Sequence, residues 1–279
     1  MKIGVIGAGT MGHGIAHVCA QAGYDVVLAD ADPQALERAV RSVTANLDKG
    51  VEKGKVGAEQ RASALARLRT GDVAACAEGA DLVIEAVPEK LELKQRLFAA
   101  VAATAPASCV LATNTSSLSV ARIAAGVPDP GRVIGTHFFN PVHIMELLEV
   151  VVAEQTRPEV VDAVRAFGAR IGKEVIVVRD RPGFATSRLG VALGMEAIRM
   201  VEEGVASAED IDKAMTLGYG FPMGPLRLTD LVGLDVRLAI GEYLAKELGN
   251  PAFEPPALMR SMVAEGRLGK KVGKGFYDW

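Results

Sequence analysis

The sequence of 279 residues has few of the features that mark specialised protein classes. Its three cysteines, Cys19, Cys76 and Cys109, are odd in number and lie among small or apolar neighbours, which excludes a disulfide framework and a paired C-x-x-C metal site. They are typical of buried thiols in a reducing compartment. A basic excess is also missing, because 31 Lys and Arg face 34 Asp and Glu for a formal net charge of −3. We therefore expect no nucleic-acid partner.

Long apolar runs are absent as well. The opening stretch after Lys2 resembles a secretory signal only superficially, because its glycines weaken a helix and His13 and His17 interrupt it. No other run reaches the roughly 18 uninterrupted apolar residues of a membrane span. With 49% hydrophobic and 23% charged residues, the composition is that of a soluble globular chain, and the cytoplasm is the expected location.

Glycine is the residue in excess, with 30 in the chain and five within the first 14 positions. Residues 7–12 match G-x-G-x-x-G between an apolar strand predicted at 2–6 and a helix predicted at 11–22. In this context the first glycine makes the tight turn, the second lets a pyrophosphate approach the backbone, and the third lets the helix pack on the strand. The residues of this predicted dinucleotide-binding turn are Gly7, Gly9, Thr10, Met11 and Gly12.

An acidic residue, Asp30, follows the next predicted strand at 25–29. It lies 23 residues after Gly7, the distance at which a carboxylate accepts hydrogen bonds from the adenosine ribose hydroxyls. A carboxylate there repels the 2′-phosphate of NADP, so NAD is the expected cofactor. A glycine turn that served only packing would not account for Asp30.

Apolar segments alternate with helical periods along the first two thirds of the chain. A long amphipathic helix is predicted from Pro33 to about Asp48, and the basic-rich segment 49–55 leads to a second helix around 59–67. The continuous apolar runs indicate a parallel sheet covered by helices on both faces and extended by later strands. Further strands are predicted at 81–87, 109–113, 132–138, 147–152 and 174–178.

The pattern changes near residue 180, since only helical periods follow Pro182. We therefore predict an α/β fold class, with a Rossmann-type dinucleotide-binding domain over 1–181. An all-α C-terminal domain is predicted over 182–279.

The chain has only four histidines, so histidine chemistry has few candidates. His13 and His17 have the i, i+4 spacing of a zinc pair, but position 14 is Gly instead of a Glu base and no ligand cluster follows. We predict no metal site, and expect His13 near the cofactor turn.

His137 ends an apolar strand, where ligands bind in open α/β sheets. Glu149 stands inside the apolar segment 147–152, and an unpaired carboxylate on a buried strand costs on the order of several kcal/mol. His137 is its natural partner. Such a pair fixes the imidazole tautomer and raises its basicity, as a general base for a hydroxyl proton requires. A purely structural strand-end histidine is the alternative.

A polar run, Asn114 to Ser117, follows the strand predicted at 109–113. One hydroxyl would be enough to cap the helix predicted at 118–125, so four polar residues in a row favour contacts with substrate or cofactor. Glu89 and Lys94 follow the strand at 81–87, and an ordinary helix start with solvated charges explains them equally well.

Together these segments resemble the L-3-hydroxyacyl-CoA dehydrogenase family, most closely its short bacterial single-function members. The resemblance covers nearly the whole chain and is carried by 7–16, 84–94, 114–119, 135–150, 182–189, 218–235 and 269–279. It implies reversible NAD-linked oxidation of an L-3-hydroxyacyl-CoA, of short chain such as 3-hydroxybutyryl-CoA, to the 3-ketoacyl-CoA.

The resemblance also implies roles for individual residues. His137 becomes the catalytic base, Glu149 its orienting partner, and Ser116 a donor to the 3-oxygen of the substrate. Asn140 falls near the nicotinamide and the catalytic centre, and Lys53 where the family contacts coenzyme A. The residues that fall at NAD contacts are Glu89, Lys94, Asn114, Ser116, Asn140 and Lys271.

In the family the helical C-terminal domain closes over the thioester and supplies a homodimer interface. This chain departs from the family pattern P-G-F-x-x-N-R by carrying Ser187 in place of the asparagine. Serine is shorter and lacks the amide donor, and Ser187 is kept as a candidate contact to the acyl or thioester end.

Two other functions are compatible with the sequence. One is a dehydrogenase of free 3-hydroxy acids or sugar acids on the same scaffold, and the other is an NADH-binding protein without turnover. The joint presence of Ser116, His137, Glu149 and Asn140 disfavours the second.

Overall fold

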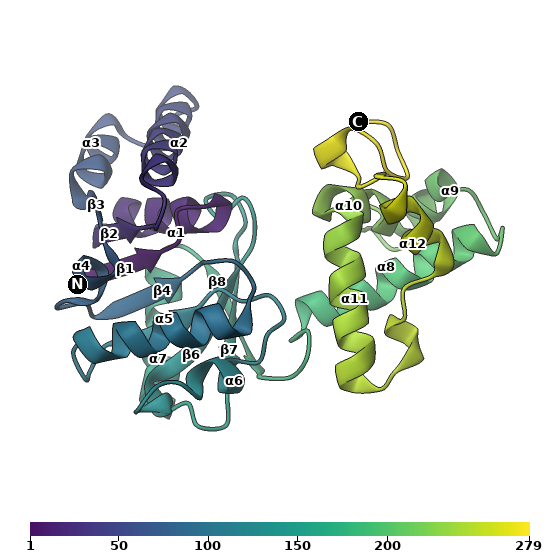
Figure 1. Ribbon diagram of the computed structural model, residues 1–279. Coiled ribbons are helices and arrows are strands. Elements are labelled where there is room, and N and C mark those ends of the chain that lie inside the picture. The colour runs from purple at the N-terminus through teal and green to yellow at the C-terminus, as the bar shows by residue number, and fades with distance from the viewer. The chain divides into compact units, whose positions relative to one another are not determined.

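The computed structural model describes all residues, 1–279, and the chain divides into two compact units, Met1–Arg181 and Pro182–Trp279. Figure 1 colours the first unit purple to teal and the second green to yellow.

The first unit is built on an eight-stranded sheet in the order β3-β2-β1-β4-β5-β6-β7-β8. Neighbouring strands run parallel except β6 and β7, which are antiparallel. The strands are β1 Lys2–Ile6, β2 Asp25–Ala29, β3 Leu68–Gly71, β4 Leu82–Glu85, β5 Val110–Thr113, β6 Val133–Phe138, β7 Leu147–Val152 and β8 Glu174–Arg179.

The expected parallel arrangement therefore holds only up to β6. A parallel return needs a crossover of a dozen or more residues, and the connection 139–146 is too short to supply one, so β7 turns back beside β6. The edge strand β3 was not predicted. Its sequence, LRTG, contains no apolar run that would predict a strand, and Arg69 and Thr70 are exposed.

Helices cover both faces of this sheet, and Figure 1 shows α1 and α5 on opposite sides of it. They are α1 Thr10–Gln21, α2 Pro33–Glu52, α3 Ala58–Arg67, α4 Val73–Ala77, α5 Leu91–Thr104, α6 Val120–Ala124 and α7 Pro158–Arg170, with a 3-10 turn at Pro130–Arg132. One core cluster joins the strands to α1, α2, α3 and α7 through residues such as Ile3, Leu28, Ile15, Val43, Ala64 and Val164.

Helix α2 begins where the sequence predicts, with Asp32 accepting from the Gln34 amide and Pro33 in the first turn. It ends later than predicted, at Glu52, and Lys53 is its C-cap residue. The basic-rich segment 49–55 is therefore helical only as far as Glu52. The chain turns immediately after Lys53, which is exposed.

All three cysteines are buried and free, as predicted. Burial raises the pKa of Cys19, that of Cys76 to about 12 and that of Cys109 to about 11, so the thiols stay protonated.

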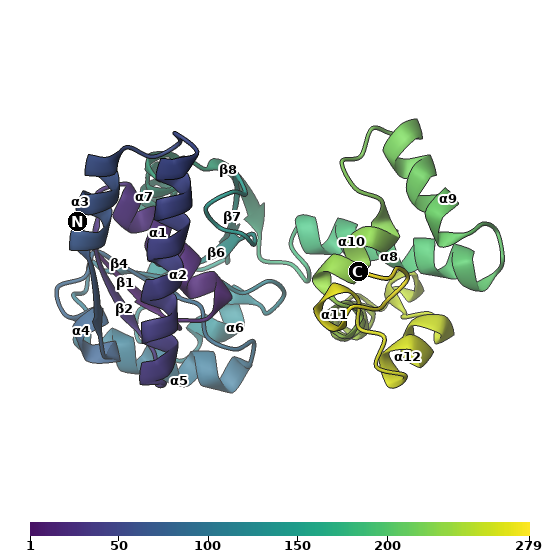
Figure 2. The same ribbon diagram turned by 90° about the horizontal axis from the view of Figure 1, so that it is seen from above.

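The second unit is helical, with no strand beyond isolated bridges of residues 269, 274 and 278. Its helices, visible from above in Figure 2, are α8 Thr186–Glu202, α9 Ala208–Lys213, α10 Pro225–Val232, α11 Leu234–Leu248 and α12 Ala257–Ala264. Short turns of 3-10 or π type lie at Ala214–Gly218, Pro251–Phe253 and Lys270–Val272.

A buried carboxylate, Asp230, holds the C-terminal tail of this unit. It accepts hydrogen bonds of 2.9 Å from the amides of Phe276 and Tyr277 and from the indole of Trp279. A Cβ on Gly275 would lie 2.1 Å from the Asp230 carboxylate, so only glycine fits there.

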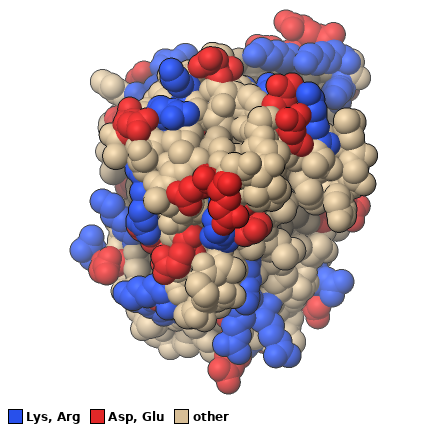
Figure 3. Space-filling model, turned by 90° about the vertical axis from the view of Figure 1, so that its right-hand side faces the viewer, with Lys and Arg blue, Asp and Glu red and all other residues tan.

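The surface carries both signs of charge. On the face shown in Figure 3, Lys and Arg alternate with Asp and Glu around an uncharged area. None of the helices is both long and apolar enough to cross a membrane.

Candidate functional site

The glycine turn after β1 has the shape that a dinucleotide pyrophosphate needs. Gly7 has φ +105°, and a Cβ on Gly12 would lie 1.6 Å from the Gly7 carbonyl oxygen, so α1 packs too closely on the turn for any side chain. Gly9 instead faces open space, and no side chain caps the amides at the start of α1. The turn therefore offers both open space beside Gly9 and uncapped backbone N–H groups, and these two features fit the phosphates of NAD.

Asp30 lies directly beside this turn. Its Oδ2 accepts from the Ala8 amide at 2.6 Å and its Oδ1 from the Asp32 amide at 2.9 Å. The Asp32 carboxylate accepts from Arg38 at 3.0 Å, so its charge is paired. The Asp30 carboxylate at the end of β2 makes a poor site for a 2′-phosphate, which fits NAD better than NADP.

His137 and Glu149 face each other directly across the antiparallel β6–β7 pair. Their Nδ1 and Oε2 atoms are 2.8 Å apart, and Glu149 is completely buried. The burial argument made from the sequence therefore identified the correct partner. A hydrogen bond from Nδ1–H to the carboxylate leaves Nε2 as the nitrogen that can take up a proton.

The polar run after β5 lies against the end of β6. The Asn114 side-chain oxygen accepts from the Phe138 amide at 2.9 Å, which ties the run to the residue that follows His137. Glu89 accepts from the Ser116 amide at 2.9 Å and from the Thr115 hydroxyl at 2.5 Å. Ser116, in the loop after β5, and His137, near the end of β6, thus lie at the carboxyl ends of two neighbouring strands.

Lys94 is fully buried, so its interpretation as a solvated charge is wrong. Its Nζ lies 2.7 Å from Glu85 Oε1 and 3.2 Å from Glu89 Oε2. Direct contact of Lys94 with NAD stays a prediction, whereas its hold on Glu89 is structural fact.

Burial by itself would raise the pKa of Glu89. The Lys94 charge and hydrogen bonds from Thr115 and Ser116 outweigh it and lower that pKa below its ordinary value. Glu89 is therefore ionised at neutral pH.

Glu85 is a site residue that sequence reasoning missed. It ends β4, is 1% exposed, and accepts from Lys94, from the Thr113 hydroxyl and from the Val87 amide, each at 2.7 Å. The signal was present, because Glu85 interrupts the apolar run 82–87 as Glu149 interrupts 147–152. The argument that a buried carboxylate needs partners applies to both.

The other predicted residues are more dispersed. Asn140 is exposed in the connection 139–146, and Lys53 is exposed at the end of α2. Ser187 lies in the first turn of α8 and Lys271 in the 3-10 turn at 270–272, so both belong to the second unit. Lys271 bonds both Asp235 oxygens at 2.6 Å. The substrate and NAD contacts of these four residues stay predictions.

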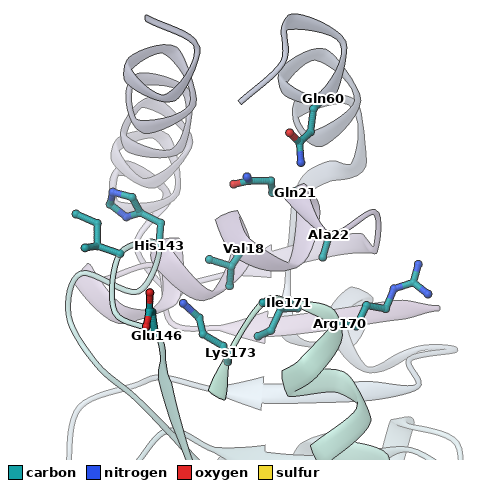
Figure 4. A pocket seen from close by; sticks show the side chains of 11 residues that line it. Val18, Gln21, Ala22, Gln60, His143, Glu146, Arg170, Ile171 and Lys173 are labelled. Carbon is teal, nitrogen blue, oxygen red and sulfur yellow. The ribbon is translucent and has the colours of Figure 1, made fainter. Parts of the chain in front are cut away.

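A separate hollow of about 410 Å³ opens between α1, α3 and the end of α7. Figure 4 shows Gln21 and Gln60 on one side of it and Lys173 on the other. His143, on its rim, stacks on the buried His17 with ring centroids 5.3 Å apart. His13 instead points its Nδ1 at the Gly9 carbonyl, 2.9 Å away, which places it beside the glycine turn. No three His, Cys, Asp or Glu side chains are arranged to hold a metal ion.

Comparison with known proteins accounts for both units. Residues 2–181 match the family model described as 3-hydroxyacyl-CoA dehydrogenase, NAD binding domain, and residues 183–279 match the C-terminal domain of the same family. A 3-hydroxybutyryl-CoA dehydrogenase of Bradyrhizobium diazoefficiens is 42% identical, covering 100% of this chain and 95% of the relative. One of Mycobacterium tuberculosis is 41% identical, covering 100% and 98%.

A solved structure shows the same fold. The crystal structure of (S)-3-hydroxybutyryl-CoA dehydrogenase from Ralstonia eutropha superposes with a TM-score of 0.96 at 40% identity, covering 100% of this chain and 98% of that one. NAD is the cofactor of the matched domain, and the glycine turn and Asp30 fit it.

We predict that Gly12→Ala raises the dissociation constant of NADH by roughly a hundredfold or more, because its Cβ would force α1 away from the turn. NADH fluorescence measures the binding. Gly57→Ala is the matched control, since nothing lies within 4 Å of the added methyl group. Equal NADH affinity of the two variants would contradict this assignment of the turn.

Folding stability should depend on pH through His17. Burial, followed by the charge of His143, lowers the pKa of His17 from 6.5 to about 4. The unfolded chain therefore takes up a proton as the pH falls through 6.5, whereas the folded protein does so only near 4. The associated stability is complete above pH 6.5 and is lost as the pH falls toward 4, by about 3 kcal/mol in total.

We predict that His17→Gln loses less unfolding free energy than the wild type between pH 7 and pH 4.5, measured by urea denaturation. Lys49→Gln, at an exposed position of α2 and without a group that titrates in this range, is the control. Parallel pH profiles for His17→Gln and the wild type would show that this ring does not titrate as described.

Proposed function

The chain belongs to the 3-hydroxyacyl-CoA dehydrogenase family, and on this premise we propose that it oxidises a short-chain L-3-hydroxyacyl-CoA reversibly to the 3-ketoacyl-CoA. The relatives named 3-hydroxybutyryl-CoA dehydrogenase favour a four-carbon acyl group. The observation that carries the proposal is the buried His137–Glu149 pair. It lies toward the carboxyl end of β6, and the glycine turn follows the carboxyl end of β1 in the same sheet. NAD, when bound, supplies the acceptor for the hydride.

In this proposal His137 accepts the proton of the substrate hydroxyl on Nε2, and returns it in the reverse direction. Glu149 holds Nδ1–H and so keeps the ring in the tautomer whose Nε2 is basic. Once the ring is protonated, the charge of Glu149 stabilises the imidazolium. The two strands make this geometry rigid, because His137 and Glu149 are registered partners within the sheet.

Ser116 holds the 3-oxygen in the proposed complex, and Asn140 lies close to the reacting carbon. The Glu89 carboxylate supports Ser116 by accepting from its amide, and the hydroxyl is 3.4 Å from the same oxygen. Ser116 is therefore held at its backbone in the loop that follows β5, the strand next to β6, which favours a fixed position for the oxygen.

Contact with the coenzyme A portion of the substrate is assigned to Lys53, and contact with its acyl or thioester end to Ser187.

The second unit is proposed to form a homodimer. Supporting this, Leu217 is 84% and Tyr219 78% exposed, and Tyr219 contacts the ring of Phe221, which gives the unit an apolar surface segment at 217–221. The three reduced cysteines favour a cytoplasmic location.

We predict that His137→Gln lowers turnover of acetoacetyl-CoA with NADH by about three orders of magnitude or more, because glutamine cannot accept the proton. NADH affinity should stay close to that of the wild type, since the glycine turn is untouched. The rate of NADH oxidation measures turnover, and titration of NADH fluorescence measures the affinity. Near-normal turnover in this variant would refute the assignment of the base.

The substrate class is tested by comparing acetoacetyl-CoA with free acetoacetate. We expect kcat/KM to be higher for the thioester by about a hundredfold or more, because only the thioester offers the nucleotide contacts. Ser187→Ala should raise the KM for acetoacetyl-CoA, with the exposed Ser261→Ala as control. Equal rates on both substrates would favour a dehydrogenase of free acids, and an unchanged KM would show that Ser187 is inert.

A further inference from the structure

The strand order fixes where the two halves of a bound dinucleotide lie. Asp30 follows β2, the glycine turn follows β1, Glu89 follows β4, and Ser116 follows β5. A dinucleotide binds at the reversal of strand order, here between β1 and β4. With the adenosine at Asp30 and the phosphates at the glycine turn, the nicotinamide half must extend over β4 and β5. The segment after β4 therefore borders the nicotinamide.

This segment also packs directly on the glycine turn. A Cβ on Gly7 would lie 2.5 Å from the Ala86 carbonyl oxygen and 3.0 Å from the Val87 nitrogen. The Val87 amide in turn donates to Glu85 at 2.7 Å. The charged groups of the segment are thus close to the phosphate-binding backbone.

Three charged side chains, Glu85, Lys94 and Glu89, form a cluster there. Both oxygens of Glu85 are occupied, one by Lys94 and the Val87 amide and the other by Thr113. Lys94 brings one positive charge for two carboxylates, so the cluster has a net charge of −1. The Lys94 Nζ atom lies closer to Glu85 Oε1, at 2.7 Å, than to Glu89 Oε2, at 3.2 Å.

The excess negative charge appears at the surface only on Glu89. Its side chain is 34% exposed, whereas Glu85 is 1% and Lys94 0% exposed. Lys94, Thr115 and Ser116 keep it ionised, as described above. A fixed, ionised carboxylate therefore borders the region assigned to the nicotinamide.

We propose that the Glu85–Lys94–Glu89 cluster raises the affinity of the enzyme for oxidised cofactor relative to its affinity for reduced cofactor. Glu89 is the discriminating charge, and Glu85 is a positioning residue that acts through Lys94. The nicotinamide ring carries one positive charge in NAD⁺ and none in NADH, so a nearby carboxylate binds the oxidised form more tightly. Of the proposed function, this inference rests on cofactor binding alone and not on the substrate.

The experiment compares the dissociation constants of NAD⁺ and NADH for the wild type, Glu89→Gln and Glu85→Gln. NADH is titrated by its fluorescence, and NAD⁺ by competition against NADH. Glu89→Gln should weaken NAD⁺ relative to NADH by roughly tenfold, because the amide oxygen still accepts from Thr115 and Ser116 while the charge is gone. Glu85→Gln should shift the ratio in the same direction, since Lys94 then neutralises Glu89 alone.

Glu92→Gln is the matched control, an acid-to-amide change at an exposed position of the first turn of α5. It should leave the ratio unchanged. A purely structural role of the cluster would change both dissociation constants by one common factor, and that result, or no change in Glu89→Gln, would overturn the proposal. Failure of the wild type to bind either form would instead overturn the cofactor assignment itself, and with it the proposed function.

Discussion

A carboxylate inside a sheet must be paired, and this requirement organises the candidate site at the carboxyl ends of β4, β5 and β6 in the first unit. Glu149 in β7 and Glu85 at the end of β4 are both almost completely buried in apolar strands. One is satisfied by His137, and the other by Lys94, Thr113 and a backbone amide. Each pairing holds a second segment in place, because an unpaired buried charge costs on the order of several kcal/mol, a large fraction of the stability of a typical protein.

The two pairings have different consequences. The Glu149 pair fixes one imidazole nitrogen and so defines which nitrogen can exchange a proton. The Glu85 pair fixes Lys94, and Lys94 in turn forms an ion pair with Glu89. Glu89 accepts from the Ser116 amide and so holds the loop that contains Ser116. The proposed proton acceptor and the loop proposed to hold the substrate oxygen are therefore positioned by separate networks on neighbouring strands.

The second unit uses the same device for structure. Asp230 holds the C-terminal tail, and Asp212 accepts from the amides of Leu226 and Arg227 at the start of α10. Glycines surround both carboxylates, because a Cβ on Gly224 or Gly275 would lie within 2.5 Å of Asp212 or Asp230. Gly224 and Gly275 are therefore required by close packing against buried acids.

Local pattern in the sequence determined much of this protein. Periodicity and the glycine spacing identified β1, α1, β2 and the dinucleotide turn, because strand and helix formation there depends on neighbouring residues. Burial alone was enough to pair Glu149 with His137, since the chain offers few histidines and a buried acid needs a partner.

Only the tertiary structure decided what depends on separated segments. The direction of β7 followed from the length of one connection, and the edge strand β3 from pairing with β2 rather than from its own sequence. The burial of Lys94 depends on Glu85 and Glu89 closing around it from β4 and the loop that follows. A charged residue on a predicted helix looks the same in sequence whether it faces water or another charge, because its partners come from other parts of the chain.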